Sequence, residues 1–133
     1  MIQEDYCSYE IAKLLKEKGF NVFLPFGFNR FSHIKGPRKF IKDEGRGGYY
    51  DNKEDWISCP THQMACKWLR EEKDIFITIY CGRNVYNDEP YYRATYQRLD
   101  DEPMEYPIGV DNDYSVYETC VEAALRYCLG NLV

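Results

Sequence analysis

The chain has 133 residues and a formal net charge of −5, with 44% hydrophobic and 29% charged residues. This length suits a single domain, residues 1–133, and the composition is that of a folded protein rather than a disordered tail. The net charge is too small for a nucleic-acid mimic or a dedicated basic binder. Aromatic residues reach 17%, led by 13 tyrosines. We expect some of these rings at the surface, where they favour binding, or else along the wet edge of a small sheet.

The first residues lack a basic segment followed by an apolar stretch, so we expect no export signal. No stretch approaches the roughly 20 apolar residues that cross a bilayer. These features predict a cytoplasmic protein without a membrane partner. In a reducing cytoplasm the six cysteines are expected to be free thiols, often buried as small hydrophobic side chains.

Three helices are predicted from apolar periodicity and capping residues. The first follows Ser8 as N-cap, covers residues 10–18 and ends at Gly19. The second opens after Thr61. The third begins at Ser115 and Glu118, which fit a capping box, and continues with an apolar stripe. That stripe consists of Tyr117, Cys120, Val121, Ala124, Leu125 and Cys128.

Two strands are predicted from alternation with a period of two. Residues 74–80 carry apolar side chains on both faces, which favours a central strand. Residues 91–99 form the second strand, and an antiparallel hairpin with a long loop is the simplest pairing. The acidic, proline-containing residues 100–113 are expected to be a loop.

Residues 21–57 are variable and weakly patterned. Short strands are expected at residues 22–24 and after the glycines at 45–48. A long segment of this kind inside a compact domain is either functional or poorly assigned. Together these elements predict an α+β fold, with a small antiparallel sheet and three helices packed mainly on one face.

Two stretches carry a resemblance to a known family, CPTHQMACKWLREE at residues 59–72 and YETCVEAALRYCL at residues 117–129. The start EIAKLLKEKGF at residues 10–20 fits the same plan. The chain resembles small uncharacterised proteins from phages and integrated mobile elements of gut bacteria. The resemblance covers about half of the chain and leaves residues 21–57 outside. It implies a mobile-element origin and a shared fold, and it brings no activity and no catalytic residues.

The spacing of Cys59, His62 and Cys66 is the pattern closest to a metal site. Thiolate and imidazole ligands suit zinc, but structural zinc sites usually need four ligands and no second Cys-x-x-Cys pair exists. We therefore expect no metal and no other cofactor. Six cysteines with His33 and His62 could form a catalytic pair in space, although no local signature selects one.

The segment 30–50 mixes basic and aromatic residues, as grooves for single-stranded nucleic acid do. The candidate contact residues are Lys35, Arg38, Lys39, Lys42, Arg46, Tyr49 and Tyr50. The alternative is a solvated basic loop that docks onto the acidic loop 100–113 of its own fold. Residues 87–122 hold ten acidic residues against Arg93 and Arg98, and this asymmetry could steer a charged partner or favour self-association.

The surplus of tyrosine and the lack of a catalytic signature favour a non-enzymatic interaction protein. Its partner would be a host protein or a second copy of the chain. A nucleic-acid-binding accessory protein that uses segment 30–50 is the first alternative. An unrecognised small enzyme is the second.

Overall fold

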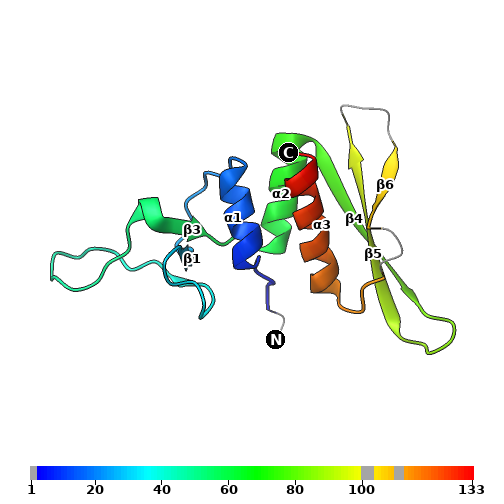
Figure 1. Cartoon of the computed structure of the whole chain (residues 1–133), viewed down its shortest axis with the longest axis horizontal. Coiled ribbons are helices and arrows are strands. Elements are labelled where there is room, and N and C mark those ends of the chain that lie inside the picture. Colours follow the sequence, from blue (N-terminus) through cyan, green and yellow to red (C-terminus); the bar gives the residue numbers. More distant parts are fainter. Residues whose placement is uncertain (1–2, 100–103, 110–112) are drawn as a thin grey trace. The chain divides into compact units, whose positions relative to one another are not determined.

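The computed structural model describes residues 3–99, 104–109 and 113–133 (Figure 1). It confirms the predicted α+β fold, with three α-helices and two three-stranded antiparallel sheets in the described residues. The prediction placed the strands in one small sheet, whereas the structure distributes them over two. The chain divides into two compact units, residues 1–61 and 62–133, which are described separately below. The expectation of a single domain stays a prediction.

The first unit begins with helix α1, Tyr9–Glu17, at the place that the sequence predicted. The hydroxyl of Ser8 accepts a hydrogen bond from the backbone N–H of Ile11 at 3.3 Å, which confirms the N-cap. Gly19 follows the helix with a φ of 109°, a left-handed conformation that favours glycine. The helix therefore ends where its last lysines and this glycine predicted.

The sheet of the first unit has the order β2–β1–β3, with strands Arg38–Lys39, Phe26–Asn29 and Trp56–Ser58. A one-turn 3-10 helix, Lys53–Asp55, leads directly into β3. The strands predicted at residues 22–24 and after residue 48 are wrong. At Leu24 the backbone bonds to side chains instead of a ladder, donating to Ser58 Oγ at 2.9 Å and accepting from Trp56 Nε1 at 2.8 Å.

A small hydrophobic core joins α1 to this sheet. Its buried members are Ala12, Phe28, Ile57 and Cys59, and the rings of Tyr9 and Phe26 pack against them. Gly27 in β1 is buried, and a Cβ there would lie 2.3 Å from the backbone oxygen of Ile57. The close approach of β1 and β3 therefore requires glycine at this position.

The second unit contains helices α2, His62–Lys73, and α3, Tyr117–Asn131. Its sheet has the order β4–β5–β6, with strands Ile75–Arg83, Pro90–Arg98 and Glu105–Ile108. The predicted hairpin is confirmed, with Ile75 opposite Arg98 and Arg83 opposite Pro90. The predicted central position of β4 is wrong, because β6 pairs with β5 and leaves β4 at the edge. Strand β6 lies within residues 100–113, which were predicted as a loop. The acidic residues and Pro107 of that stretch interrupt the alternation of apolar and polar side chains that would indicate a strand.

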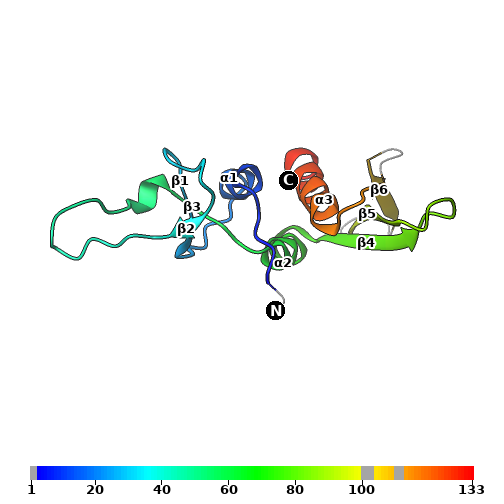
Figure 2. The ribbon, with the colours of Figure 1, turned by 90° about the horizontal axis from the view of Figure 1, so that it is seen from below.

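Helix α3 packs on one face of this sheet, beside α2 (Figure 2). The ring of Tyr127 lies 5.7 Å from that of Tyr96 in β5, and Arg98 Nη2 donates to the backbone oxygen of Leu132 at 2.7 Å. The predicted apolar stripe is buried from Cys120 to Cys128, whereas Tyr117 at its start is exposed.

The predicted capping box at the start of α3 is wrong. The N-cap is Val116, which has extended backbone angles and no side-chain cap, so Ser115 lies one residue too early. The preceding Tyr114 exchanges two backbone hydrogen bonds with Tyr92 of β5, at 2.7 and 2.9 Å. This bridge to the sheet fixes the chain just before the helix begins. No helix in the described part of the chain is long and apolar enough to cross a membrane.

Candidate functional site

Asp51 lies at the base of an exposed loop, residues 42–50, and its side chain is 0% exposed. Arg38 Nη1 and Nη2 donate to its two carboxylate oxygens at 2.7 and 2.8 Å. Three further donors reach the same carboxylate: the backbone N–H of Ile41 at 2.7 Å, the hydroxyl of Tyr49 at 3.0 Å and the amide of Asn29 at 3.3 Å. The hydrogen bonds from Arg38, helped by the other donors, hold the pKa of Asp51 well below its usual range. The carboxylate therefore stays ionised although it is buried.

The guanidinium of Arg38 is held in place on its other sides by aromatic rings. Its central carbon lies 5.5 Å from the ring of Trp56 and 6.0 Å from that of Tyr49. The backbone N–H of Asp51 donates to the backbone oxygen of Ile41 at 2.8 Å, which closes the loop at its base. Strands β1 and β2, the start of the loop and its end are thus joined through one carboxylate.

Every residue from 41 to 50 is exposed, and the loop extends away from the β1–β3 sheet (Figures 1 and 2). The loop and the end of β2 surround a hollow of about 590 Å³. Its basic side chains are Lys39, Lys42 and Arg46, and none of them forms an ion pair with a residue that the structure describes. The acidic residues Asp43 and Glu44 and the rings of Tyr49 and Tyr50 also line the hollow. Basic residues thus outnumber acidic ones on this surface, which we call the loop surface.

The structure brings together five of the seven predicted nucleic-acid contacts, namely Lys39, Lys42, Arg46, Tyr49 and Tyr50. The guanidinium of Arg38 is instead bound to Asp51, and Lys35 does not line the hollow. Docking of this segment onto residues 100–113 stays a prediction, since residues 100–103 and 110–112 lie outside the described part of the chain.

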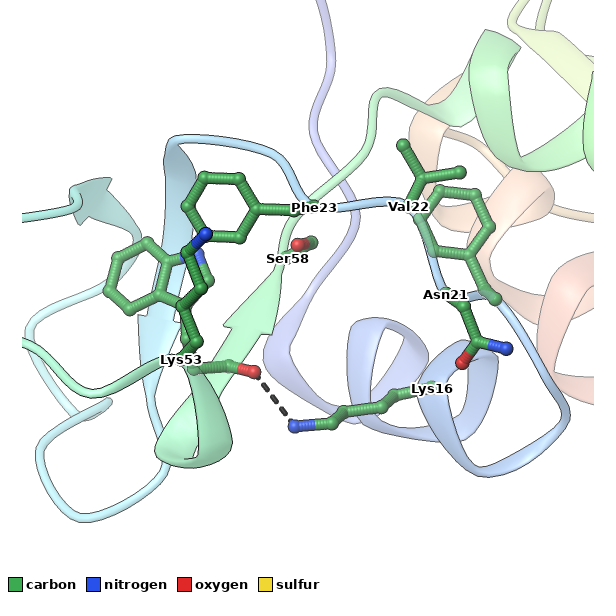
Figure 3. Close-up of a pocket in the computed structure, with 8 residues that line it drawn as sticks. Lys16, Asn21, Val22, Phe23, Lys53 and Ser58 are labelled. Atoms are coloured by element: carbon green, nitrogen blue, oxygen red, sulfur yellow. Dashed lines mark hydrogen bonds between the residues drawn. The ribbon is translucent and has the colours of Figure 1, made fainter.

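A second hollow, of about 200 Å³, lies beside α1 (Figure 3). It is lined by Lys16, Phe20, Asn21, Val22, Phe23, Lys53, Trp56 and Ser58. The ammonium group of Lys16 donates to the backbone oxygen of Trp56 at 2.8 Å, and that of Lys53 lies 5.0 Å from the ring centre of Phe23. Two ammonium groups at one hollow, one of them over an aromatic ring, can bind a carboxylate or another small anionic group.

Three aromatic rings connect this hollow to the base of the loop. Phe40 meets Phe23 edge to face at 5.2 Å and Trp56 at 5.0 Å, and Trp56 in turn lies against Arg38. Sequence reasoning missed Lys16, Lys53 and Trp56 as parts of a site. The signal available was the high aromatic content, which gives no positions.

The three candidate zinc ligands have other neighbours. Cys59 Sγ donates to the backbone oxygen of Cys7 at 3.1 Å, and His62 Nε2 lies 3.3 Å from a carboxylate oxygen of Glu122. Burial raises the pKa of Cys66. Within residues 3–99, 104–109 and 113–133, no group of three or more histidine, cysteine or acidic side chains could hold a metal ion.

Cys120 and Cys128 do not resemble activated nucleophiles, and His33 lies against an aromatic ring. Burial raises the pKa of Cys120, and it raises that of Cys128 to about 12. A cysteine nucleophile needs a lowered pKa, because the thiolate is the reactive form. His33 stacks on the ring of Tyr9 with centres 3.6 Å apart. The two hollows described above are lined by neither cysteine nor histidine.

Known proteins give no direct guide to these features. No family model, no curated protein and no solved structure matches the chain. Function must therefore be inferred from the residues, contacts and charges of the two units.

Proposed function

We propose that the protein is a non-enzymatic interaction protein of mobile-element origin that acts in the cytoplasm through its loop surface. The observation that carries this proposal is the contrast between the loop and its base. Residues 42–50 are all exposed, yet the base is fixed by five hydrogen bonds to the buried carboxylate of Asp51. Ordering an exposed loop costs conformational entropy, and the cost is repaid when a preorganised loop binds a partner.

The chemistry of the loop surface favours a partner that carries negative charge. Lys42 and Arg46 have no ion-pair partner among the described residues, and Tyr49 and Tyr50 are 62% and 50% exposed. Tyrosine and arginine are enriched at the residues that dominate protein interfaces. We expect an acidic surface of a host protein, with one acidic side chain entering the hollow between Lys16 and Lys53.

Nucleic acid is the second candidate partner, favoured by a further exposed ring on Phe31, whose backbone N–H donates to Asn29, a neighbour of Asp51 at the base of the loop. Phe31 is 73% exposed, and the guanidinium of Arg30 lies 4.6 Å from its ring centre. Exposed rings stack on unpaired bases while lysine and arginine attract phosphates. Phe31 and Lys35 would then extend the contact beyond the loop itself.

A pull-down from host lysate tests both candidates with the same variants. Tagged wild-type protein is compared with Lys42→Glu/Arg46→Glu, and Lys13→Glu/Lys67→Glu serves as a charge-matched control on exposed helix positions. We expect a protein partner that survives nuclease treatment, binds the wild type and the control, and is lost from the loop variant. Recovery of nucleic acid that weakens steeply with salt would support the second candidate instead. Equal recovery of partners by the loop variant and the wild type would contradict the proposal.

A further inference from the structure

The outer edge of strand β4 exposes a row of unpaired backbone groups. Leu99 N–H donates to the oxygen of Asp74 at 3.1 Å, and Asn84 N–H donates to the oxygen of Glu89 at 2.9 Å. These bonds set the phase of the β4–β5 ladder, in which hydrogen-bonded and non-hydrogen-bonded pairs alternate. Even-numbered residues of β4 therefore bond to β5, and odd-numbered residues turn their N–H and C=O groups outward.

The hydrogen bonds of β5, the central strand of the sheet, confirm this alternation independently. Tyr92 stands opposite Cys81, but it exchanges both of its backbone hydrogen bonds with Tyr114 on its other side. The backbone of Cys81 must then point away from β5. The outward groups of Ile77, Ile79 and Cys81 hydrogen-bond to no residue that the structure describes.

Strand β4 lacks the features that usually protect an edge. Edge strands of stable monomers are short, or carry proline, a bulge or an exposed charge. Strand β6, the opposite edge, has four residues and contains Pro107. Strand β4 has nine residues, and its stretch IFITIYC, residues 75–81, contains no charge, no proline and no glycine. Such a segment is strongly disposed to pair with another strand.

We propose that β4 pairs antiparallel with β4 of a second copy of this chain, so that the two sheets form one continuous six-stranded sheet. The uncharged stretch is centred on Thr78, and pairing about that residue places Ile77 opposite Ile79 and Ile75 opposite Cys81 of the second copy. All outward-pointing residues of the stretch then find partners, and residues 75–81 contain no charged side chain. This self-complementarity favours a second copy over an unrelated strand.

The proposed register makes two side-chain contacts explicit. The odd-numbered isoleucines lie on the helix-covered face, since Ile75 is buried and Tyr96, which stands opposite Ile77, packs against Tyr127 of α3. Their pairing with the second copy would extend that apolar layer. On the other face, the exposed Thr78 would stand opposite its own equivalent at the two-fold axis, a favourable pair of threonines.

The first test is the dimerisation of the full chain, measured by sedimentation or light scattering over a range of concentrations. Thr78→Lys places two ammonium groups opposite each other in the dimer. Because the side chain of Thr78 is exposed, the substitution should leave the β4–β5 ladder intact. We expect its dimer dissociation constant to rise by at least about tenfold. Thr119→Lys, the same substitution at an exposed position on α3, should dimerise like the wild type.

The second test uses disulfide formation and does not depend on how a lysine is tolerated. In a Cys81→Ser background, Thr78→Cys should form a covalent dimer on oxidation, because opposite Cβ atoms of such a pair lie about 5 Å apart. Tyr80→Cys should not, because its two copies would be four residues apart, about 13 Å along the strands. A wild-type monomer throughout the concentration range, a dimer that Thr78→Lys leaves unchanged, or equal crosslinking at positions 78 and 80 would each overturn the proposal.

Discussion

Replacement of Asp51 by asparagine is the sharpest test of how the loop surface is held. The substitution keeps the shape of the side chain, removes the negative charge and exchanges one acceptor oxygen for an N–H donor. Arg38 and the backbone N–H of Ile41 would then face a neutral group, one end of which repels them. The carboxylate is fully buried, so water cannot replace the lost acceptor.

The size of the effect follows from burial on both sides of the ion pair. Removing one partner of a fully buried pair costs about 3–5 kcal/mol. The side chain of Arg38 is 33% exposed, which allows partial rehydration and reduces that cost. The lost acceptor adds about 1 kcal/mol for each neutral hydrogen bond left unmade. We expect Asp51→Asn to lower the free energy of unfolding of the first unit by about 3 kcal/mol.

The assay must report on the first unit alone, because a chain of two compact units need not unfold in one step. The chain has two tryptophans, Trp56 in β3 and Trp68 in α2. In a Trp68→Phe background, the fluorescence of the buried Trp56 during urea unfolding follows the first unit. Glu44→Gln, at an exposed acid of the same loop, is the matched control and should change stability by less than about 0.5 kcal/mol.

A double-mutant cycle with Arg38→Ala separates the ion pair from the other hydrogen bonds. We expect a coupling energy of about 2 kcal/mol between Arg38 and Asp51. A loss of less than 1 kcal/mol for Asp51→Asn, similar to the Glu44→Gln control, would refute the role assigned to the carboxylate. A large loss with no coupling would instead mean that the bond from Ile41 holds the loop.

Three further predictions follow from single contacts. Gly27→Ala should destabilise the first unit by roughly 3 kcal/mol in the same fluorescence assay, since its Cβ would meet the backbone of β3. Gly130→Ala, in α3 of the second unit and followed by the loss of helical circular dichroism, should be neutral or slightly stabilising because nothing lies within 4 Å of the added Cβ; equal losses of stability would contradict the packing described. Folding lowers the pKa of Asp51, so the ionised carboxylate stabilises the first unit at pH values above its unfolded pKa of about 3.9, and this stabilisation is lost on further acidification. As the pH is lowered through about 4, the urea concentration at the unfolding midpoint should therefore decrease in the wild type and decrease less in Asp51→Asn. Iodoacetamide at pH 8 should alkylate the exposed Cys81 at least about tenfold faster than the buried Cys128, whose pKa is about 12. Mass spectrometry of peptides measures the two rates, and faster alkylation of Cys128 would contradict this prediction.

Elements with strong local patterns could be predicted from the sequence. Ser8 and Gly19 mark the ends of α1 through local capping geometry, and the alternation of residues 75–80 identified β4. The edge position of β4 could not be predicted, because apolar side chains on both faces are also typical of a central strand. Phe76 on the face away from α3 is only half-buried. The start of α3 was predicted at the wrong residue because Ser115 fits an N-cap by sequence. The pairing of Tyr114 with β5 sets the actual boundary of the helix.

The candidate site was predictable only as far as its composition. Clustered lysines and tyrosines identified segment 30–50, but the carboxylate that organises it gave no local signal. Asp51 joins Asn29 in β1 to Arg38 in β2, which are 22 and 13 residues away. Contacts at such separations depend on strand pairing, and the short strands of the first unit lack the alternation that would predict it.

The distribution of charge between the units predicts opposite salt responses for the two proposed surfaces. Residues 1–61 carry ten basic and nine acidic residues, while residues 62–133 carry seven and thirteen. In the first unit, the basic groups at the loop surface have no ion-pair partners among the described residues, so partner binding there should weaken about tenfold or more between 50 and 500 mM salt.

The proposed β4 interface contains no charge between residues 75 and 81. Raising the salt concentration can screen repulsion between two acidic units, so the dimer should keep its affinity or bind more tightly over the same range. Sedimentation of the chain alone and partner binding by the same preparation measure the two responses side by side. A dimer that dissociates with salt in parallel with the partner would mean that one charged surface makes both contacts, and that the uncharged edge of β4 makes neither.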